Sequence, residues 1–380
     1  MAENELSSLR AEIDVIDRRL TELFSDRLDV SEKIAAFKQK NGIAIYDPIR
    51  ESEKLEMIAS GAKDSVKPYV KQLYSLLSDI SKDRQSRLIR THSKLYDKIN
   101  TAIGLTPKMP PDSPRVACRG AAGAFTSAVA GKLFKSPKIE YTKSYESVIR
   151  AVEGGYAQFG ILPAGGEGIG DIYRLLEKSN VYIALTAVLK TEYCLLGNPG
   201  SSLGTIREIV SHEDAVTGCR DFIDALGDVK IIYSRSTADA AKQVSESGRL
   251  DIAAIASRQC TGIYDLETLK AGVQNAACGD MRFVCISKEL FIYPGSDKTS
   301  VTFTVSDTAG SLFRVLSKFN SLGINLSSIK SLPVMGDGFA YRFFLGFDTP
   351  VYSEEFALLM QSIESSCDSF RYFGTYREII

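Results

Sequence analysis

Histidine is scarce in this chain, and cysteine occurs without a metal-binding or disulfide pattern. The 380 residues include two histidines, His92 and His212, which lie far apart in the sequence. The seven cysteines are scattered, and none forms a Cys-x-x-Cys pair. An odd number of dispersed cysteines argues against a disulfide framework and favours small buried side chains. These absences exclude a histidine or cysteine metal centre as the basis of function, and we expect no metal and no cofactor.

An excess of one charge and a long apolar run are also missing. Lysine and arginine number 46 against 47 aspartates and glutamates, so no global basic field favours nucleic acid as a partner. No apolar segment has the length of a membrane span, and the polar N-terminal segment differs from a secretory leader. We therefore expect a cytoplasmic protein that acts on small molecules. The length allows two or three domains.

The N-terminal segment carries two interleaved heptad series, which predict one long amphipathic helix over residues 6–40. The series are Leu6, Ile13, Leu20, Arg27, Ile34 and Leu9, Ile16, Leu23, Val30, Phe37. Arg27 is the one polar member of the predicted buried stripe. A guanidinium in that position is costly unless it meets an anion, which could be a protein carboxylate or a ligand. A coiled-coil helix that tolerates one polar core residue is the simpler alternative.

The other basic residues of this helix favour an anionic ligand. Lys38 is eleven residues after Arg27, which places it only ~20° away around the helix and ~16 Å along it. Arg10 lies ~100° off that face, so a neighbouring copy of the chain is better placed to supply it. A helix ~50 Å long is more than a small lone domain covers, which also predicts a partner chain.

The following segments add polar groups to this inventory. Asn41-Gly42 suits a helix end, and Asp47-Pro48 suits the start of another helix, with Arg50 and Glu51 in its first turn. A third helix is predicted over residues 66–96, where Ser81 and Gln85 share one face. Cations, carboxylates, a hydroxyl and an amide without a nucleophile would bind a small polyanion and polarise it without forming a covalent bond.

Residues 1–95 resemble the all-helical chorismate mutase domain that opens bacterial bifunctional chorismate mutase–prephenate dehydratases. The family's active-site positions are matched by Arg10, Arg27, Lys38, Asp47, Arg50, Glu51, Ser81 and Gln85. The resemblance implies that Arg10 crosses to the partner subunit of a homodimer and that the three arginines hold the two carboxylates of chorismate. It further implies that Lys38 and Gln85 face the ether oxygen and that Glu51 holds the hydroxyl.

A linker is predicted over residues 96–114, where four prolines interrupt helical structure at its end. Residues 115–290 then alternate between strand and helix patterns, which predicts a two-lobed α/β domain with a cleft. Strands are expected at 115–118, 159–162, 181–188, 193–196, 231–233 and 252–256, and helices at 126–134, 222–226 and 238–245.

This region resembles a prephenate dehydratase domain, which implies a periplasmic-binding-protein-like fold. The resemblance assigns to its cleft Thr126, Ser127, Gly166, Glu167, Ser211, His212, Ser236, Thr237, Ala238, Arg282 and Phe283. Several reactive positions depart from the family: Thr186 and Tyr193 replace a glutamate and a histidine, and Met281-Arg282-Phe283 replaces a Thr-Arg-Phe motif. A thioether cannot donate the hydrogen bond of a threonine hydroxyl. We expect poor or absent dehydratase activity, unless Thr126, Glu167 or Asp214 substitutes for the missing groups.

Residues 298–377 read as βαββαβ, with strands at 299–305, 325–331, 339–347 and 370–376 and helices at 312–322 and 354–365. This α+β ferredoxin-like pattern resembles an ACT domain, in which an amino-acid effector binds. The matching positions are Gly310, Ser311, Leu312, Ser331 and Pro333, but Lys330 and Leu332 replace a glutamate and an arginine. Effector sensing and a purely dimerising role both remain open.

Three functions follow from these patterns. The first is a chorismate mutase fused to a dehydratase-like domain of doubtful activity and an ACT-like domain. The second is a fully bifunctional enzyme that makes phenylpyruvate for phenylalanine synthesis. In the third, the C-terminal two-thirds are a non-catalytic regulator that binds ligands.

Overall fold

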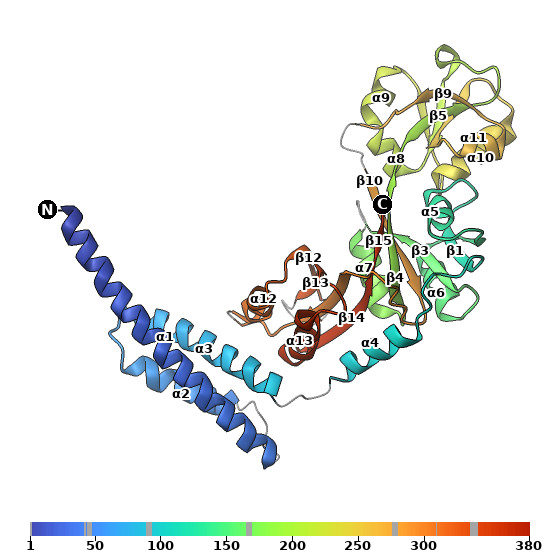
Figure 1. The fold of residues 1–380 in the computed structure, drawn as a ribbon. Helices are drawn as coiled ribbons and strands as arrows, with labels where there is room; N and C mark the ends of the chain where they lie inside the picture. Colours follow the sequence, from blue (N-terminus) through green and yellow to red (C-terminus); the bar gives the residue numbers. More distant parts are fainter. Residues whose placement is uncertain are drawn as a thin grey trace. The chain divides into compact units, whose positions relative to one another are not determined.

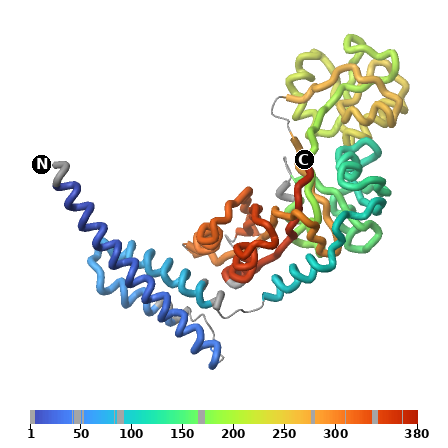
Figure 2. Tube along the Cα trace, viewed as in Figure 1, coloured from blue at the N-terminus to red at the C-terminus, as the bar shows by residue number. Residues whose placement is uncertain are grey.

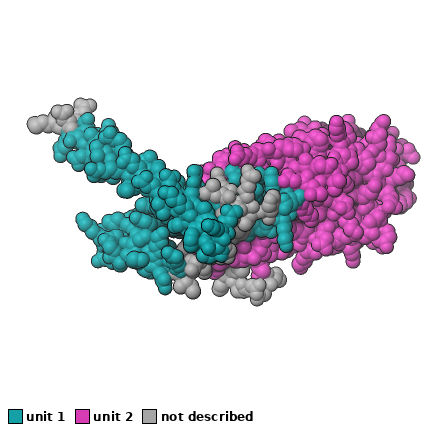
Figure 3. All heavy atoms as spheres, turned by 60° about the horizontal axis from the view of Figure 1, so that its bottom comes forward, with its two compact units in different colours: residues 1–97, 310–318, 357–366 teal, residues 98–309, 319–356, 367–380 magenta. Residues whose placement is uncertain are grey.

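The structure is a computed structural model, and it describes residues 2–41, 43, 48–88, 93–164, 169–275, 280–308, 310–334 and 341–380. The chain divides into two compact units, which Figure 3 distinguishes by colour. The first unit contains Met1–Asp97, Gly310–Lys318 and Ala357–Ser366, and the second contains Lys98–Ala309, Phe319–Phe356 and Cys367–Ile380. None of the helices in the described ranges is both long enough and apolar enough to cross a membrane.

The N-terminal part of the first unit is helical, as the heptads predict. It contains α1 (Ala2–Lys40), α2 (Pro48–Ser60) and α3 (Lys67–Leu88). The C-terminal half of α1 packs along α3, and Figures 1 and 2 show its N-terminal half running beyond α2 and α3. Ala35 of α1 and Ala59 of α2 are buried. Small side chains at these positions let the helices approach closely.

The predicted apolar stripe of α1 is exposed in the single chain. All nine apolar heptad positions are at least 45% exposed, and the exposed fraction reaches 65% at Leu23. The heptads therefore predicted the helix correctly, but their burial requires a surface that the described part of one copy of the chain does not provide. An exposed apolar face of this length favours a second protein surface against it.

The predicted third helix is wrong at its C-terminal end. Helix α3 ends at Leu88, and a separate helix, α4 (Lys94–Leu105), occupies much of the predicted linker. Ser93 starts this helix because its hydroxyl accepts a hydrogen bond from the Tyr96 backbone N–H at 3.3 Å. Burial of Ile99 and Ala102 stabilises it, and the prolines that follow end it.

Two of the sheets in the second unit form the two lobes of an α/β fold. The first lobe has a six-stranded sheet in the order β15-β4-β10-β3-β1-β2, and the second has a five-stranded sheet in the order β7-β6-β8-β5-β9. The strands are β1 (Arg115–Arg119), β2 (Lys138–Thr142), β3 (Phe159–Pro163), β4 (Tyr182–Lys190), β5 (Tyr193–Gly197), β6 (Glu208–Ser211), β7 (Lys230–Tyr233), β8 (Ile252–Ser257), β9 (Glu267–Ala271), β10 (Asp280–Ser287) and β15 (Glu378–Ile379). The chain passes between the lobes after β4 and again before β10, as a two-lobed domain with a cleft requires.

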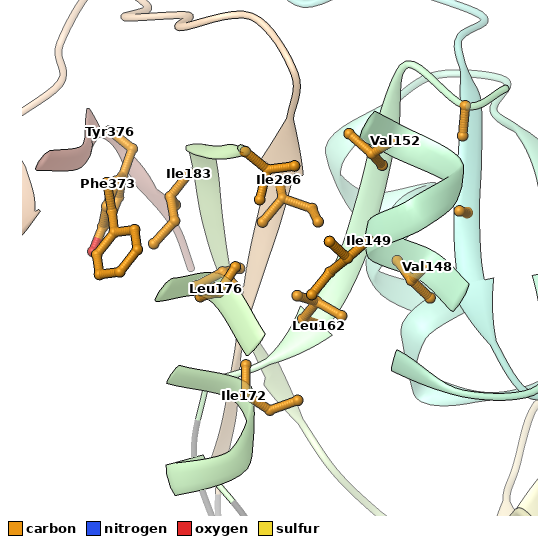
Figure 4. Close-up of a cluster of buried hydrophobic side chains, with 14 of the residues drawn as sticks. Val148, Ile149, Val152, Leu162, Ile172, Leu176, Ile183, Ile286, Phe373 and Tyr376 are labelled. Atoms are coloured by element: carbon orange, nitrogen blue, oxygen red, sulfur yellow. The ribbon is translucent and has the colours of Figure 1, made fainter. Parts of the chain in front are cut away.

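Helices connect and cover these strands. They are α5 (Phe125–Leu133), α6 (Tyr145–Glu153), α7 (Ile169–Lys178), α8 (Glu213–Gly218), α9 (Arg220–Ala225), α10 (Thr237–Ser247) and α11 (Cys260–Tyr264), with a 3₁₀ turn, η1, at Leu203–Thr205. Alternate residues of β10 enter different cores: Val284 and Ile286 pack with α6, while Phe283 and Cys285 pack with α5. Helices α5 and α6 therefore cover opposite faces of the six-stranded sheet. Figure 4 shows the core on the α6 side.

The C-terminal region has the predicted βαββαβ order. Its elements are β11 (Lys298–Thr304), α12 (Ser311–Ser321), β12 (Leu326–Pro333), β13 (Tyr341–Asp348), α13 (Glu354–Ile363) and β14 (Ser369–Tyr376), with a 3₁₀ turn, η2, at Glu364–Ser366. The strands form an antiparallel sheet in the order β12-β13-β11-β14. The start of the predicted strand 339–347 lies partly outside the described residues.

Strand β15 was not predicted. It follows β14 and pairs in parallel with Thr186 and Ala187 of β4, so the chain's last residues complete the six-stranded sheet (Figure 1). Gly374 allows this approach, because its φ is +144° and a Cβ there would lie 2.3 Å from the Ile183 carbonyl oxygen. The C-terminal region is thereby joined to the sheet of the first lobe.

Candidate functional site

A cavity of about 490 Å³ lies among α1, α2 and α3, and it collects five predicted site residues. These are Arg27, Lys38, Arg50, Ser81 and Gln85, together with the polar residues Asp26, Ser31, Lys54, Ser78 and Lys82 and the apolar residues Leu23, Val30 and Ile34. Cations clearly outnumber carboxylates in this lining. Such a cavity has the size and the charge to hold a small organic dianion.

Arg27 is held in place by α3 and not by a carboxylate. Its Nη1 donates a hydrogen bond to the Leu77 carbonyl oxygen at 2.8 Å and another to the Ser81 hydroxyl, which itself donates to the Leu77 carbonyl at 2.7 Å. Burial lowers the pKa of the guanidinium, although arginine stays protonated at neutral pH. Within the described part of the chain no carboxylate forms an ion pair with Arg27. Its charge is therefore available to an anionic ligand.

Gln85 is positioned by a residue that the sequence analysis missed. Its Nε2 donates a hydrogen bond of 2.6 Å to the Ser31 hydroxyl, and the two side chains are only 8% and 6% exposed. Ser31 follows Arg27 by four residues, so it lies on the same face of α1. A search for hydroxyls one helical turn from Arg27 would have found it. The contact limits how the Gln85 amide can rotate in the cavity.

Two further cations, Lys54 and Lys82, were also missed. Lys54 follows Arg50 by one turn of α2, and Lys82 is adjacent to Ser81 on α3. Lys82 Nζ lies 3.4 Å from an oxygen of Asp79, which partly balances its charge. The i, i+4 spacing from Arg50 was the available signal for Lys54.

Three predicted mutase residues are not brought into the cavity by the described structure. Arg10 is exposed on α1, 17 residues before Arg27 and therefore ~25 Å along the helix. Asp47 and the side chain of Glu51 lie outside the described residues. The cavity of one chain therefore contains the five predicted residues named above, whereas Arg10 lies apart from it.

The predicted cleft residues of the second unit occupy the ends of strands and the starts of helices. The Thr126 hydroxyl donates to the Arg119 carbonyl at 3.0 Å, and the Ser127 hydroxyl donates to the Ala124 carbonyl at 2.7 Å. Ser211 is completely buried and donates to the Ile255 carbonyl at 2.7 Å. The first two hydroxyl groups stabilise the turn between β1 and α5, and the Ser211 hydroxyl joins β6 to β8.

The next predicted residues, which include His212 and Ser236, lie at the starts of helices. Nδ1 of His212 accepts a hydrogen bond from the Asp214 backbone N–H at 3.3 Å at the start of α8. The Ser236 hydroxyl accepts one from the Asp239 N–H at 3.0 Å, and Thr237 and Ala238 form the first turn of α10. Gly166 and Glu167 lie outside the described residues.

The Met-Arg-Phe segment of β10 is engaged in structural contacts. Phe283 is 2% exposed and, with the partly buried Met281, packs in the core on the α5 side of the sheet. Arg282 forms an ion pair with Glu378 of β15, whose Oε1 accepts from the arginine Nη2 at 3.3 Å. The carboxylate that holds Arg282 comes from the strand that the sequence analysis missed, so this contact could not be predicted.

Thr186 and Tyr193, the other two positions at which this sequence departs from the family, are also buried. Thr186 is 1% exposed, and its hydroxyl has no hydrogen-bond partner within the described ranges. Tyr193 packs edge-on against Phe125, with ring centroids 5.3 Å apart. Neither residue reproduces the ionisable groups that the family resemblance implies at these positions.

The predicted effector-binding residues lie on separate elements. Gly310 has a φ of +84° and precedes Ser311 and Leu312 at the start of α12, where the Ser311 hydroxyl accepts from Arg314 Nη2 at 3.0 Å. Ser331 and Pro333 lie on β12, whose side chains are largely exposed. These positions stay predictions for an effector site.

Comparisons with known proteins match the helical part and the α/β part of the chain separately. The chorismate mutase type II family model matches residues 9–86, and the prephenate dehydratase model matches residues 116–290. The bifunctional chorismate mutase/prephenate dehydratase of Aquifex aeolicus is 28% identical over 378 residues, 98% of each chain. The chain belongs to the bifunctional chorismate mutase–prephenate dehydratase family. It thus joins a chorismate mutase domain to a prephenate dehydratase domain with a two-lobed α/β fold.

Two other relatives each match about two-thirds of the chain or slightly more. Arogenate dehydratase/prephenate dehydratase 1 of Arabidopsis thaliana is 30% identical over 275 residues, which are 70% of each chain. The crystal structure of prephenate dehydratase in complex with L-Phe from Arthrobacter aurescens has a TM-score of 0.63 and 23% identity. It covers 69% of this chain and 89% of that chain. At this identity the structural match supports the fold alone.

Proposed function

We propose that the chain converts chorismate to prephenate in the cavity formed by α1, α2 and α3. The observation that carries the proposal is the convergence of Arg27, Lys38, Arg50 and Gln85 on one cavity from three helices. Chorismate carries two carboxylates and rearranges through a pericyclic transition state that needs no proton transfer. A cavity with several cations and a neutral amide suits that reaction, because it can hold the folded conformer and stabilise developing charge.

Each cavity residue has a role that its chemistry allows. Arg27 and Arg50 bind the carboxylates, since guanidinium groups form bidentate hydrogen bonds with them. Lys38 and Gln85 donate to the ether oxygen as its bond to carbon breaks, and Glu51 holds the hydroxyl. The contact between Gln85 and Ser31 supports this assignment, because an amide that is already oriented loses little freedom when substrate binds.

The proposal includes a homodimer in which Arg10 completes the site of the other copy. Two properties of α1 support it: the apolar heptad positions are exposed, and Arg10 is exposed in the N-terminal half that runs beyond α2 and α3. A second copy covering this face would bury the stripe and would bring its Arg10 to a cavity that already contains Arg27 and Arg50.

Mixing two inactive variants tests both parts of this proposal. Arg10→Ala and Lys38→Ala should each be nearly inactive as homodimers, because each lacks one charged group at both sites. After subunit exchange at equal concentration, half of the dimers are mixed, and each mixed dimer has one intact site. We expect about one quarter of the wild-type rate of chorismate loss. No recovery despite proven exchange would contradict a shared site, and an active Arg10→Ala protein would contradict the role of Arg10.

The dehydratase domain, in this proposal, acts on prephenate slowly or not at all. Met281 supplies no hydroxyl at the position where the family has its threonine, and Arg282 beside it is paired with Glu378. The fully bifunctional alternative is favoured by the full-length Aquifex aeolicus relative, which bears that name. Measurement of phenylpyruvate formation from added prephenate separates the two.

The C-terminal βαββαβ region is proposed to be an ACT-like domain. The element order and the turn at Gly310 support this assignment, while Lys330 and Leu332 alter the second half of the effector motif. Phenylalanine is the effector to test, because the Arthrobacter aurescens structure is a complex with L-Phe. A melting shift of the full chain at micromolar phenylalanine would support sensing, and no shift at millimolar phenylalanine would support a dimerising role alone.

A further inference from the structure

One cation of the mutase cavity, Lys54, is not among the eight positions that the chorismate mutase resemblance assigned. It lines the cavity from α2, as Arg50 does. Lys54 follows Arg50 by four residues within a 13-residue helix, so the two side chains lie on one face about one helical turn apart. Helix α2 therefore presents two neighbouring cations to the same cavity.

Lys54 has no partner within the described ranges that balances its charge. Its side chain is exposed, and no hydrogen bond or ion pair joins it to another described residue. The lysines near it are paired: Lys82 Nζ lies 3.4 Å from an Asp79 oxygen, and Lys71 Nζ lies 2.6 Å from a Glu56 oxygen. Glu56 follows Lys54 by two residues and therefore lies on another side of α2. The charge of Lys54 is thus available to an anion.

The cations of this cavity outnumber the carboxylates in its lining. Arg27 and Lys38 reach it from α1, and Asp26 is the one carboxylate among the described lining residues. Arg50 and Lys54 add a pair of like charges, which at this spacing destabilises a helix. A carboxylate bound between Arg50 and Lys54 would replace that repulsion by two attractions.

Exposure distinguishes an inner and an outer part of the cavity. Ser81 and Gln85 are buried, whereas Arg50 and Lys54 are exposed. The ether oxygen of chorismate, where charge develops, is proposed to meet Gln85 in the inner part. The carboxylates keep their charge throughout the rearrangement, so a cation in the outer part attracts substrate and transition state equally. Uniform attraction of this kind lowers KM and leaves kcat unchanged.

We propose that Lys54, together with Arg50, binds a carboxylate of the substrate in the outer part of the mutase cavity and thereby sets KM. The inference rests on the proposed mutase function and adds a binding residue to it. A lysine suits this position because its ammonium group is a compact charge on a flexible stem, which can follow the carboxylate as substrate enters. Removing the charge should weaken substrate binding without slowing the bond rearrangement.

Steady-state kinetics of chorismate loss by the full-length chain test the role of Lys54. Lys54→Gln should raise KM about tenfold, the loss of one charge-assisted hydrogen bond, and should change kcat by less than about twofold. Lys54→Arg keeps the positive charge and should restore most of the wild-type KM. Lys71→Gln is the matched control, because it removes the same charge from a lysine that pairs with Glu56 and is not part of the cavity lining. It should leave KM and kcat unchanged.

Salt provides a second readout. Mobile ions screen exposed charges, so added sodium chloride should raise the wild-type KM more steeply than the KM of Lys54→Gln. A Lys54→Gln enzyme with the wild-type KM would contradict the proposal. So would a variant that loses kcat while KM stays constant, or equal increases of KM in Lys54→Gln and Lys71→Gln.

Lys38→Ala measured in the same assay separates this inference from the proposed function. Loss of turnover by Lys38→Ala with unchanged kinetics of Lys54→Gln would keep the mutase function and overturn the role of Lys54. If the wild-type chain leaves chorismate unchanged, the mutase function fails, and chorismate becomes a stable ligand for isothermal titration. Weaker chorismate binding by Lys54→Gln than by the wild-type chain would then support the carboxylate site, and equal or absent binding would contradict it.

Discussion

The helical mutase domain and the α/β dehydratase domain differ in what surrounds the residues of their family motifs. In the first, Arg27, Lys38, Arg50 and Gln85 line one open cavity. In the second, residues at the corresponding motif positions are buried or paired with the protein itself, as Phe283 is in the core. The first set of residues thus borders a cavity, whereas the second set mainly forms contacts within the protein.

The difference shows what motif matching alone misses. Arg282 agrees with the family at its position, but its guanidinium is held by Glu378 of a strand from the far end of the chain. Arg27 also agrees with the family, and its partners among the described residues are a carbonyl and a hydroxyl, neither of which carries a compensating charge. A residue that matches the family motif can therefore have a different role, depending on which group already forms a hydrogen bond or an ion pair with it.

The largest expected effect is at Lys38. Lys38→Ala should lower mutase kcat by about 1,000-fold, because it removes a donor to the oxygen that gains charge in the transition state. Stopped assays of chorismate loss measure this, and circular dichroism checks that the helices persist. Lys71→Ala is the control, since Lys71 forms a surface ion pair with Glu56 away from the cavity. Near-normal turnover by Lys38→Ala would rule out the assigned site.

The next largest effect is expected on the pH dependence of mutase activity in the Gln85→Glu variant. The amide does not titrate, so the wild-type rate should not depend on Gln85 ionisation. A glutamate donates a hydrogen bond only when it is protonated, and its ordinary pKa is about 4.3. Activity of the variant should therefore be highest in acid and fall as pH rises through that group's pKa. Wild-type activity of Gln85→Glu at pH 8 would show that Gln85 does not donate to substrate.

These two residues were predictable, whereas the packing around them was only partly so. The heptads predicted α1, and the i, i+4 pair predicted the face of α3, because both patterns are local. The end of α3 was misplaced since the cap at Ser93 was not recognised. Strand β15 has two residues and depends on pairing with β4, which is distant in sequence. No local pattern predicts such a strand, nor the ion pair between Glu378 and Arg282.

Glu378→Gln tests, through the free energy of unfolding, whether the ion pair with Arg282 is structural. The Glu378 side chain is 9% exposed and pairs with Arg282, so loss of its charge should lower the free energy of unfolding by about 1–2 kcal/mol. Mutase turnover should not change. Urea denaturation measures the effect, and Asp224→Asn, which breaks an exposed pair on α9, should change stability by less than about 0.5 kcal/mol. Equal effects of the two variants would mean that the Arg282 contact is not structural.

The smallest expected effect is at Ser31. Ser31→Ala removes the hydrogen-bond partner of the Gln85 amide and should lower kcat about threefold to tenfold with little change in KM, because one neutral hydrogen bond is worth about 1 kcal/mol. Ser31→Thr keeps the hydroxyl and should recover part of the loss. If Ser31→Ala lowers kcat further in a Gln85→Ala background by the same factor, Ser31 does not act through Gln85.

Product analysis of the purified full-length chain supplied with chorismate tests the central contrast most directly. The reaction must be analysed without acid treatment, since acid alone converts prephenate to phenylpyruvate. An open mutase cavity and an altered dehydratase segment in the same chain predict that prephenate accumulates. Phenylpyruvate formed as fast as chorismate is consumed would contradict this account, because Met281 and the paired Arg282 would then belong to a working dehydratase.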